Sequence, residues 1–217
     1  MRSPNSRALK LAPTAAPGGD HGSAAAREAG ASARMLLIAT AIRLFCRHGI
    51  AATGVEAIVA QSGVARMTLY KNFGSKDALV AAALAHEGTV WRTWFFARLA
   101  QAEGTPWQRL LAIFDVLGEW FARDDYFGCA LMNAVAEYRN GNQAVLDVTL
   151  AHKRQVMEYI EGLCAGAEAA EPKNLAGQID LLMDGAIVKA LVSRRPEPAM
   201  EAKAILAVLL DQALPRP

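Results

Sequence analysis

The most informative stretch of this chain is TGVEAIVAQSGVARMTLYKNFGSKDAL, residues 53–79. Its apolar residues recur at helical spacing on both sides of Gly63, and a glycine in the left-handed conformation often ends a helix. Leu69 and Phe73 share one face of the segment that follows this glycine. The stretch therefore predicts two short helices joined by a tight turn, followed by the start of a longer helix.

Two short helices that meet at a Gly-containing turn form a helix-turn-helix, in which the second helix enters the major groove of DNA. We expect Arg66 and Thr68 to contact base edges and Tyr70 and Lys76 to contact phosphates. The alternative is an ordinary helical hairpin with a solvated polar face. The candidate DNA-binding residues are Thr53, Arg66, Met67, Thr68, Tyr70, Lys71, Asn72 and Lys76.

Residues 36–83 resemble the DNA-binding domain of the TetR (tetracycline-repressor) family of transcriptional regulators. Three pieces carry this resemblance in order: AIRLFCRHGIAATGVEAIVAQSGV, then TLYKNF, then SKDAL. Met67 departs from the small residue that many members have at this place. A later segment, FGCALMNAVAEY at residues 127–138, is similar to one found in a large group of TetR-like regulators.

The resemblance implies a homodimeric regulator, most often a repressor, that binds a palindromic operator in double-stranded DNA. It also implies that a small-molecule effector in the C-terminal domain changes the spacing of the two recognition helices and releases the operator. The rival interpretation is a helical small-molecule-binding or stress protein whose N-terminal hairpin only mediates association. Salt dependence separates the two, because DNA binding weakens steeply as salt rises.

Composition and charge agree with a DNA partner for one part of the chain. Residues 31–80 hold six Lys or Arg against two Asp or Glu, whereas residues 81–217 hold thirteen against seventeen. Apolar residues make up 53% of the chain, β-branched runs are few, and no apolar run reaches membrane-spanning length, so we expect an all-α cytoplasmic protein. The sequence contains no enzyme signature, no metal-ligand cluster and no cofactor motif. Its three scattered cysteines predict buried or idle thiols, with a redox sensor as the alternative.

The chain divides into three expected parts. Residues 1–30 read as a disordered arm, residues 31–80 as a three-helix DNA-binding domain, and residues 81–217 as a helical ligand-binding and dimerisation domain. We expect helix caps at Ser32, at Ser75, at a Thr53/Glu56 capping box and at a Thr105-Pro-x-Gln108 box. The remaining expected helices cover residues 127–138, 143–165, 174–193 and 198–214.

Two further sites are expected after residue 80. Aromatic residues and Met on converging helices, with polar groups among them, predict a mostly apolar effector of modest size that carries a hydrogen-bonding group; plain core is the alternative. The candidate ligand-binding residues are Trp94, Phe95, Phe114, Trp120, Phe127, Met132, Asn133, Glu137, His152 and Asp184. The last two helices carry more apolar residues than one small domain needs, which predicts a two-fold helical interface. Its candidate residues are Leu182, Gly185, Leu206 and Leu209.

Overall fold

The computed structural model of the protein describes residues 21–138 and 141–214, and this part of the chain contains nine helices and no strand. The predicted all-α class is confirmed. The helices are α1 (His21–His48), α2 (Val55–Ser62), α3 (Arg66–Phe73), α4 (Lys76–Ala100), α5 (Pro106–Phe121), α6 (Ala130–Glu137), α7 (Gln143–Gly166), α8 (Pro172–Ser193) and α9 (Pro198–Ala213).

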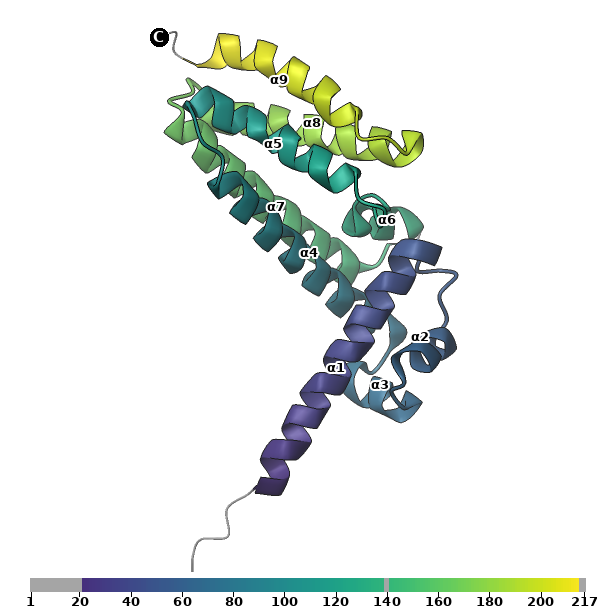
Figure 1. The fold of residues 1–217 in the computed structure, drawn as a ribbon. Coiled ribbons are helices and arrows are strands. Elements are labelled where there is room, and N and C mark those ends of the chain that lie inside the picture. The colour runs from purple at the N-terminus through teal and green to yellow at the C-terminus, as the bar shows by residue number, and fades with distance from the viewer. Residues whose placement is uncertain (1–20, 139–140, 215–217) are drawn as a thin grey trace, which may run out of the picture.

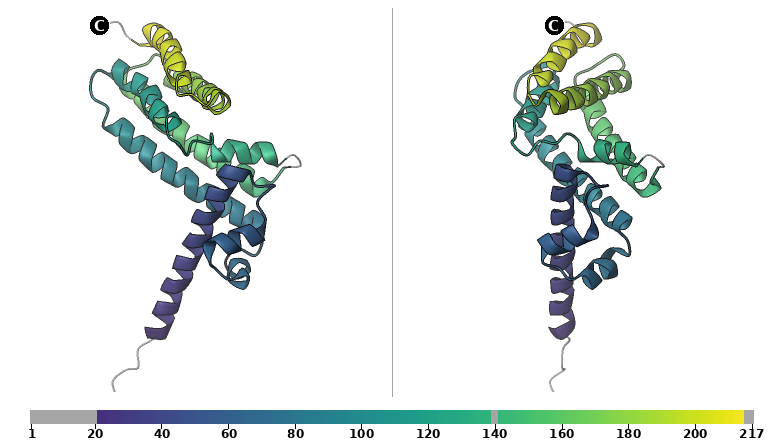
Figure 2. Two further views of the ribbon diagram at one scale, coloured as in Figure 1. Left: turned by 45° about the vertical axis from the view of Figure 1, so that its right-hand side comes forward. Right: turned by 90° about the vertical axis from the view of Figure 1, so that its right-hand side faces the viewer.

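The helices form two groups that α4 joins (Figure 1). The first group consists of α1, α2 and α3, which pack together and against the start of α4. In the second group α4 lies beside α7, and α5, α8 and α9 complete a bundle. The short helix α6 lies between the end of α1 and this bundle, and the views in Figure 2 keep α8 and α9 at the end far from α2 and α3.

Several helix ends follow from local sequence. Thr105 and Gln108 form the predicted capping box at α5, in which each side chain accepts a hydrogen bond from the backbone N–H of the other residue. Ser75 caps α4 by accepting from the N–H of Ala78. Gly63 ends α2 with a φ of 69°, the left-handed conformation that glycine adopts without a steric penalty. At these four residues the helix ends predicted from the sequence are confirmed.

Two expected helix starts are wrong. α1 begins at His21 and not near Ser32, because the alanine-rich segment before Ser32 continues the helix. Residues 21–30 are therefore helical, and the first 20 residues of the expected arm lie outside the described residues. α6 begins at Ala130 and not at Phe127, since Gly128 has a φ of 79°, which a helix does not accommodate.

The Thr53/Glu56 capping box is also absent. Gly54 occupies the N-cap position of α2, and no side chain caps this helix. The Thr53 hydroxyl donates instead to the carbonyl oxygen of Gly49 at 2.7 Å, which closes the turn after α1. Separately, none of the helices in the described ranges is both long enough and apolar enough to cross a membrane.

Candidate functional site

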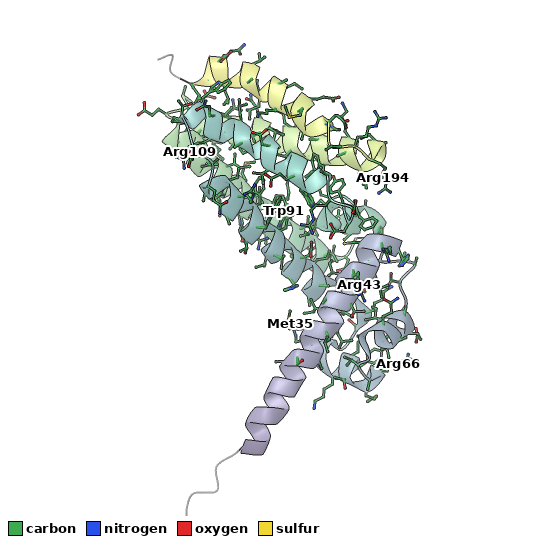
Figure 3. The ribbon with its side chains drawn as sticks, in the orientation of Figure 1. Met35, Arg43, Arg66, Trp91, Arg109 and Arg194 are labelled. Carbon is green, nitrogen blue, oxygen red and sulfur yellow. The ribbon has the colours of Figure 1, made fainter. Side chains whose placement is uncertain are left out.

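The helix-turn-helix presents one face of α3 to solvent. Ile58 on α2 and Leu69 on α3 are fully buried, and Val64 in the turn between them is nearly so. These three side chains fix how α3 packs on α1 and α2. Arg66, Met67 and Lys71 on α3 are exposed. Figure 3 shows Arg66 at the end of the molecule away from α8 and α9.

The exposed side chains of α3 combine positive charge with an apolar group. Met67 is 78% exposed, and the Arg66 side chain is 59% exposed. The Arg66 guanidinium pairs with Glu56 at 2.9 Å and lies 5.7 Å from the centre of the Tyr70 ring. Ion pairs this exposed are weak, because water and salt screen them. Arg66 is therefore able to exchange Glu56 for a phosphate or a guanine edge, and Met67 to contact a thymine methyl group.

Three other residues that were predicted to contact DNA form hydrogen bonds within the helix-turn-helix region instead. Thr53 is only 3% exposed, so the prediction that it contacts DNA is wrong: it closes the turn described above. Lys76 donates from Nζ to the carbonyl oxygen of Ile50 at 2.7 Å, and Asn72 donates to the carbonyl oxygen of Thr68 at 2.8 Å. Lys71 is exposed, while Thr68 and Tyr70 are half-buried beside it.

A cavity of about 270 Å³ lies in the bundle, where α4, α5, α6, α7 and α8 meet the end of α1. Its wall is mostly apolar and aromatic, with charged side chains among the rings. Trp91, in the middle of α4, lies inside the bundle (Figure 3). The residues that line the cavity are Cys46, Glu87, Val90, Trp91, Trp94, Trp120, Arg123, Asp125, Phe127, Gly128, Cys129, Ala130, Leu131, Met132, His152, Lys153, Val156, Met183, Asp184 and Ile187.

The structure divides the predicted ligand-binding residues into three sets. Phe95 and Phe114 are fully buried and do not line the cavity, so for them the alternative of plain core holds. Asn133 and Glu137 line a separate hollow beside the end of α1. The predicted residues that do line the cavity are Trp94, Trp120, Phe127, Met132, His152 and Asp184.

Some lining residues escaped the sequence prediction. Glu87 and Trp91 were not predicted, although they precede the predicted Trp94 on one face of α4, at i, i+4 and i+7, a spacing that the sequence displays. Asp125, between α5 and α6, also contributes to the wall. Cys46 comes from α1, and no local pattern indicated that it reaches the bundle.

Most charged groups in the wall have partners. Lys153 donates to Asp180 and to Asp184, both at 2.6 Å. Burial alone would lower the pKa of Lys153, but the two carboxylates outweigh it and the pKa is raised. Burial also raises the pKa of Asp184, although Lys153 opposes this shift. Arg123 donates to both carboxylate oxygens of Asp125 at 2.9 and 3.0 Å.

His152 is neutral in the wall. It is 6% exposed, and burial, with the nearby charges of Arg92 and Lys153, lowers its pKa to about 4. Arg92 Nη1 lies 2.8 Å from His152 Nδ1, and because a guanidinium only donates, Nδ1 accepts and Nε2 carries the proton. Trp91 Nε1, beside this ring, is a buried donor without a hydrogen-bond partner in the described part of the chain.

The short helix α6 touches both the cavity and the DNA-binding region. Its first residues, Ala130 to Met132, line the cavity. At its other end, Glu137 Oε2 accepts from the backbone N–H groups of Ile50 and Ala51 at 2.7 and 2.9 Å, in the loop between α1 and α2. The hydroxyl of Tyr138 donates to Asp77 at 2.9 Å, in the first turn of α4. One short helix thus contacts the cavity at its start and the DNA-binding region at its end.

The outer side of α8 and α9 exposes large apolar side chains. Among the predicted interface residues, Gly185 is exposed, and Leu182 and Leu209 are half-buried. Leu206 has no exposed area, so the prediction that it contacts a second copy is wrong: it packs inside the bundle. The exposed apolar residues on these two helices are Leu181, Val188, Val192, Met200, Ile205 and Val208.

Comparisons with known proteins agree with this architecture. Residues 37–83 match the family model described as bacterial regulatory proteins, tetR family. The HTH-type transcriptional regulator YjdC of Escherichia coli K12 is 23% identical over 158 residues, which cover 73% of this chain and 83% of YjdC.

Solved structures extend the match through the bundle. The TetR-family regulator SCO4454 from Streptomyces coelicolor superimposes with a TM-score of 0.76 and 26% identity, covering 84% of this chain and 96% of that one. A TetR regulator from Chloroflexus aurantiacus gives 0.75 and 24%, covering 86% and 98%. The helix-turn-helix with its exposed α3, the matched family model and the shared fold together show that the chain belongs to the TetR family of DNA-binding transcriptional regulators.

Proposed function

We propose that the protein is a ligand-responsive repressor that acts as a homodimer on a palindromic operator. In this proposal residues 31–80 bind DNA in the cytoplasm, and residues 81–217 bind the effector and the second copy. A small, mostly apolar molecule with a hydrogen-bonding group occupies the cavity of about 270 Å³ and releases the operator. The single observation that carries the proposal is α6, which lines the cavity at one end and bonds to the α1–α2 loop at the other.

The effector acts by favouring one position of α6 over another. A ligand shifts such an equilibrium only by its difference in affinity for the two states. A coupling free energy of about 1–3 kcal/mol, typical of allosteric proteins, weakens operator binding by roughly 5- to 150-fold. Because coupling is reciprocal, the operator weakens effector binding by the same factor.

The exposed side of α8 and α9 supports the dimer. Leu181, Val188 and Val192 follow one another along α8, and Ile205 and Val208 lie on α9, all at least 48% exposed. A water-exposed apolar stripe of this kind is typical of an interaction surface. Two copies joined there would present their α3 helices to successive major grooves, about 34–36 Å apart on a palindromic operator.

The test combines operator selection with a compound screen. Duplexes selected from random DNA by the full-length protein should share a palindrome, and binding to them should weaken steeply with salt. Compounds are then screened for release of the selected duplex and for quenching of tryptophan fluorescence. Trp120→Ala should abolish both responses to a compound that releases DNA from the wild type. Equal release from Trp120→Ala, or selection of no common sequence, would contradict the proposal.

The dimer has its own matched pair of variants. Val208→Glu places a charge on the exposed stripe and should give folded monomers with lost operator binding, as measured by sedimentation and circular dichroism. Leu206→Glu, two residues earlier, buries an unpaired charge in the protomer and should unfold it. A full dimer population in Val208→Glu would place the interface elsewhere.

A further inference from the structure

The carboxylate of Glu87 has no hydrogen bond or ion pair among the described residues, although it lines the cavity. Glu87 is half-buried on α4. Burial raises its pKa, while His86 and Arg123 act in the opposite direction. A half-buried carboxylate that has no partner among the described residues is free to pair with a cationic group that enters the cavity.

The other charges of the wall are already neutralised. Three lining carboxylates (Glu87, Asp125 and Asp184) face two lining cations (Arg123 and Lys153), which leaves one negative charge. Arg123 is occupied by Asp125, and Lys153 lies between Asp180 and Asp184. Of these groups, Glu87 is the one without a partner.

The remaining basic groups near the wall do not provide a free cation. His152 is neutral, because Arg92 donates to its Nδ1 and burial opposes its protonation. Arg92 itself also donates to Thr89 at 3.2 Å, and it does not line the cavity. The wall therefore offers an anionic ligand no free cation, and it offers a cationic ligand one free carboxylate.

Aromatic rings line the same cavity as this carboxylate. Trp91 and Trp94 follow Glu87 by one and two turns on the same helical face, and both line the cavity. Trp120 meets Trp91 edge-on, with ring centres 5.4 Å apart, and Phe127 completes the aromatic wall. The faces of such rings attract cations, and tryptophan does so best. Carboxylate and rings together favour the same class of ligand.

We propose that the effector is an organic cation with an apolar body, whose ammonium group lies beside Glu87 and against the rings of Trp91, Trp94 and Trp120. This rests on the proposed function, in which the cavity is the effector site. The apolar body then fills the space lined by Met132, Val156 and Met183. No metal or covalent step takes part.

The test uses two probes of the same shape on the full-length protein. Benzyltrimethylammonium carries the charge, and neopentylbenzene is its neutral isostere; binding is measured by calorimetry and by tryptophan fluorescence. The wild type should bind the cation at least about tenfold more tightly, chiefly because Glu87 attracts its charge, with the aromatic rings adding to this attraction. Glu87→Gln should remove most of this preference and leave the affinity for neopentylbenzene within about twofold.

Glu103→Gln, the same chemical change at an exposed position outside the cavity, should leave both affinities as in the wild type. Glu87→Gln keeps the size of the side chain and removes an unpaired charge, so it should melt no lower than the wild type. Equal affinity for the two probes, an unchanged preference in Glu87→Gln, or no binding of the cation would overturn the proposal. In each of these cases the proposed function would still stand if a neutral compound released the operator from the wild type and not from Trp120→Ala.

Discussion

The outer face of α3 and the wall of the cavity hold their polar side chains in opposite ways. On α3 the functional side chains are exposed, and the buried residues beneath them only position the helix. Around the cavity most polar side chains are held by one another: His152 on α7 accepts from Arg92 on α4, and Lys153 on α7 donates to Asp180 and Asp184 on α8. A change on the α3 face should therefore alter binding alone, whereas a change in the wall should alter stability as well.

The largest expected effect contrasts the two sides of α3. Leu69→Ala removes a fully buried side chain and should cost about 2–5 kcal/mol of unfolding free energy. Met67→Ala, at 78% exposure, should change this free energy by about 0.5 kcal/mol or less and still alter the selected operator. Denaturant unfolding measures the first quantity. A stability loss in Met67→Ala comparable to that in Leu69→Ala would contradict the contrast between the exposed side of α3 and the buried residues that position the helix.

The burial of His152 in the cavity wall should make the unfolding free energy depend on pH. The pKa of His152 falls from its ordinary 6.5 to about 4 in the folded chain. The unfolded state thus binds a proton first as pH falls, so the contribution of His152 is complete above pH 6.5 and is lost between pH 6.5 and 4. The full loss is about 3 kcal/mol.

His152→Asn keeps an acceptor for Arg92 but cannot ionise in this range, so its stability should fall less over the same window. Subtracting the two curves cancels the titration of the carboxylates. If the unfolding free energies of the two proteins changed with pH in parallel, the pKa of His152 in the folded state would be ordinary. This result would contradict the burial of a neutral His152 in the cavity wall. The unfolding free energy of Lys71→Ala should depend on pH as that of the wild type does, since Lys71 is exposed on α3.

A smaller effect separates two kinds of contact on the α3 face. Arg66→Ala should weaken the selected operator by about 1–3 kcal/mol and relax its sequence at one position. Lys71→Ala should weaken all duplexes alike and reduce the salt slope by about one. Fluorescence anisotropy on the operator and on a scrambled duplex, at several salt concentrations, distinguishes them. An unchanged operator preference in Arg66→Ala would remove it from the base contacts.

The sequence predicted the features that depend on neighbours along the chain. Gly63, Leu69 and the Thr105/Gln108 box lie within one or two helical turns of the residues that they serve, so spacing alone revealed them. Thr53 and Glu56 had the right spacing for a box, but the backbone entered α2 from Gly54, and the spacing alone does not determine that path.

Features that join distant segments were not predictable in this way. The partners of Lys153 are 27 and 31 residues away on another helix, and Glu137 is 86 and 87 residues from the amides that it binds. α9 is apolar on more than one side, so nothing in its sequence distinguished buried Leu206 from exposed Ile205 and Val208. Packing of the whole bundle decides these positions.

In the proposed mechanism α6 links the two regions, and Glu137 is the residue at which this link can be measured. Glu137→Gln keeps the length of the side chain but replaces the charged acceptor of the Ile50 and Ala51 amides with a weaker neutral one. Operator affinity is measured with and without a saturating compound from the screen, and compound affinity is measured separately. In the wild type the compound should weaken operator binding by roughly 5- to 150-fold. In Glu137→Gln the compound should bind the cavity as before while this ratio falls towards one; a ratio equal to that of the wild type would contradict coupling through α6.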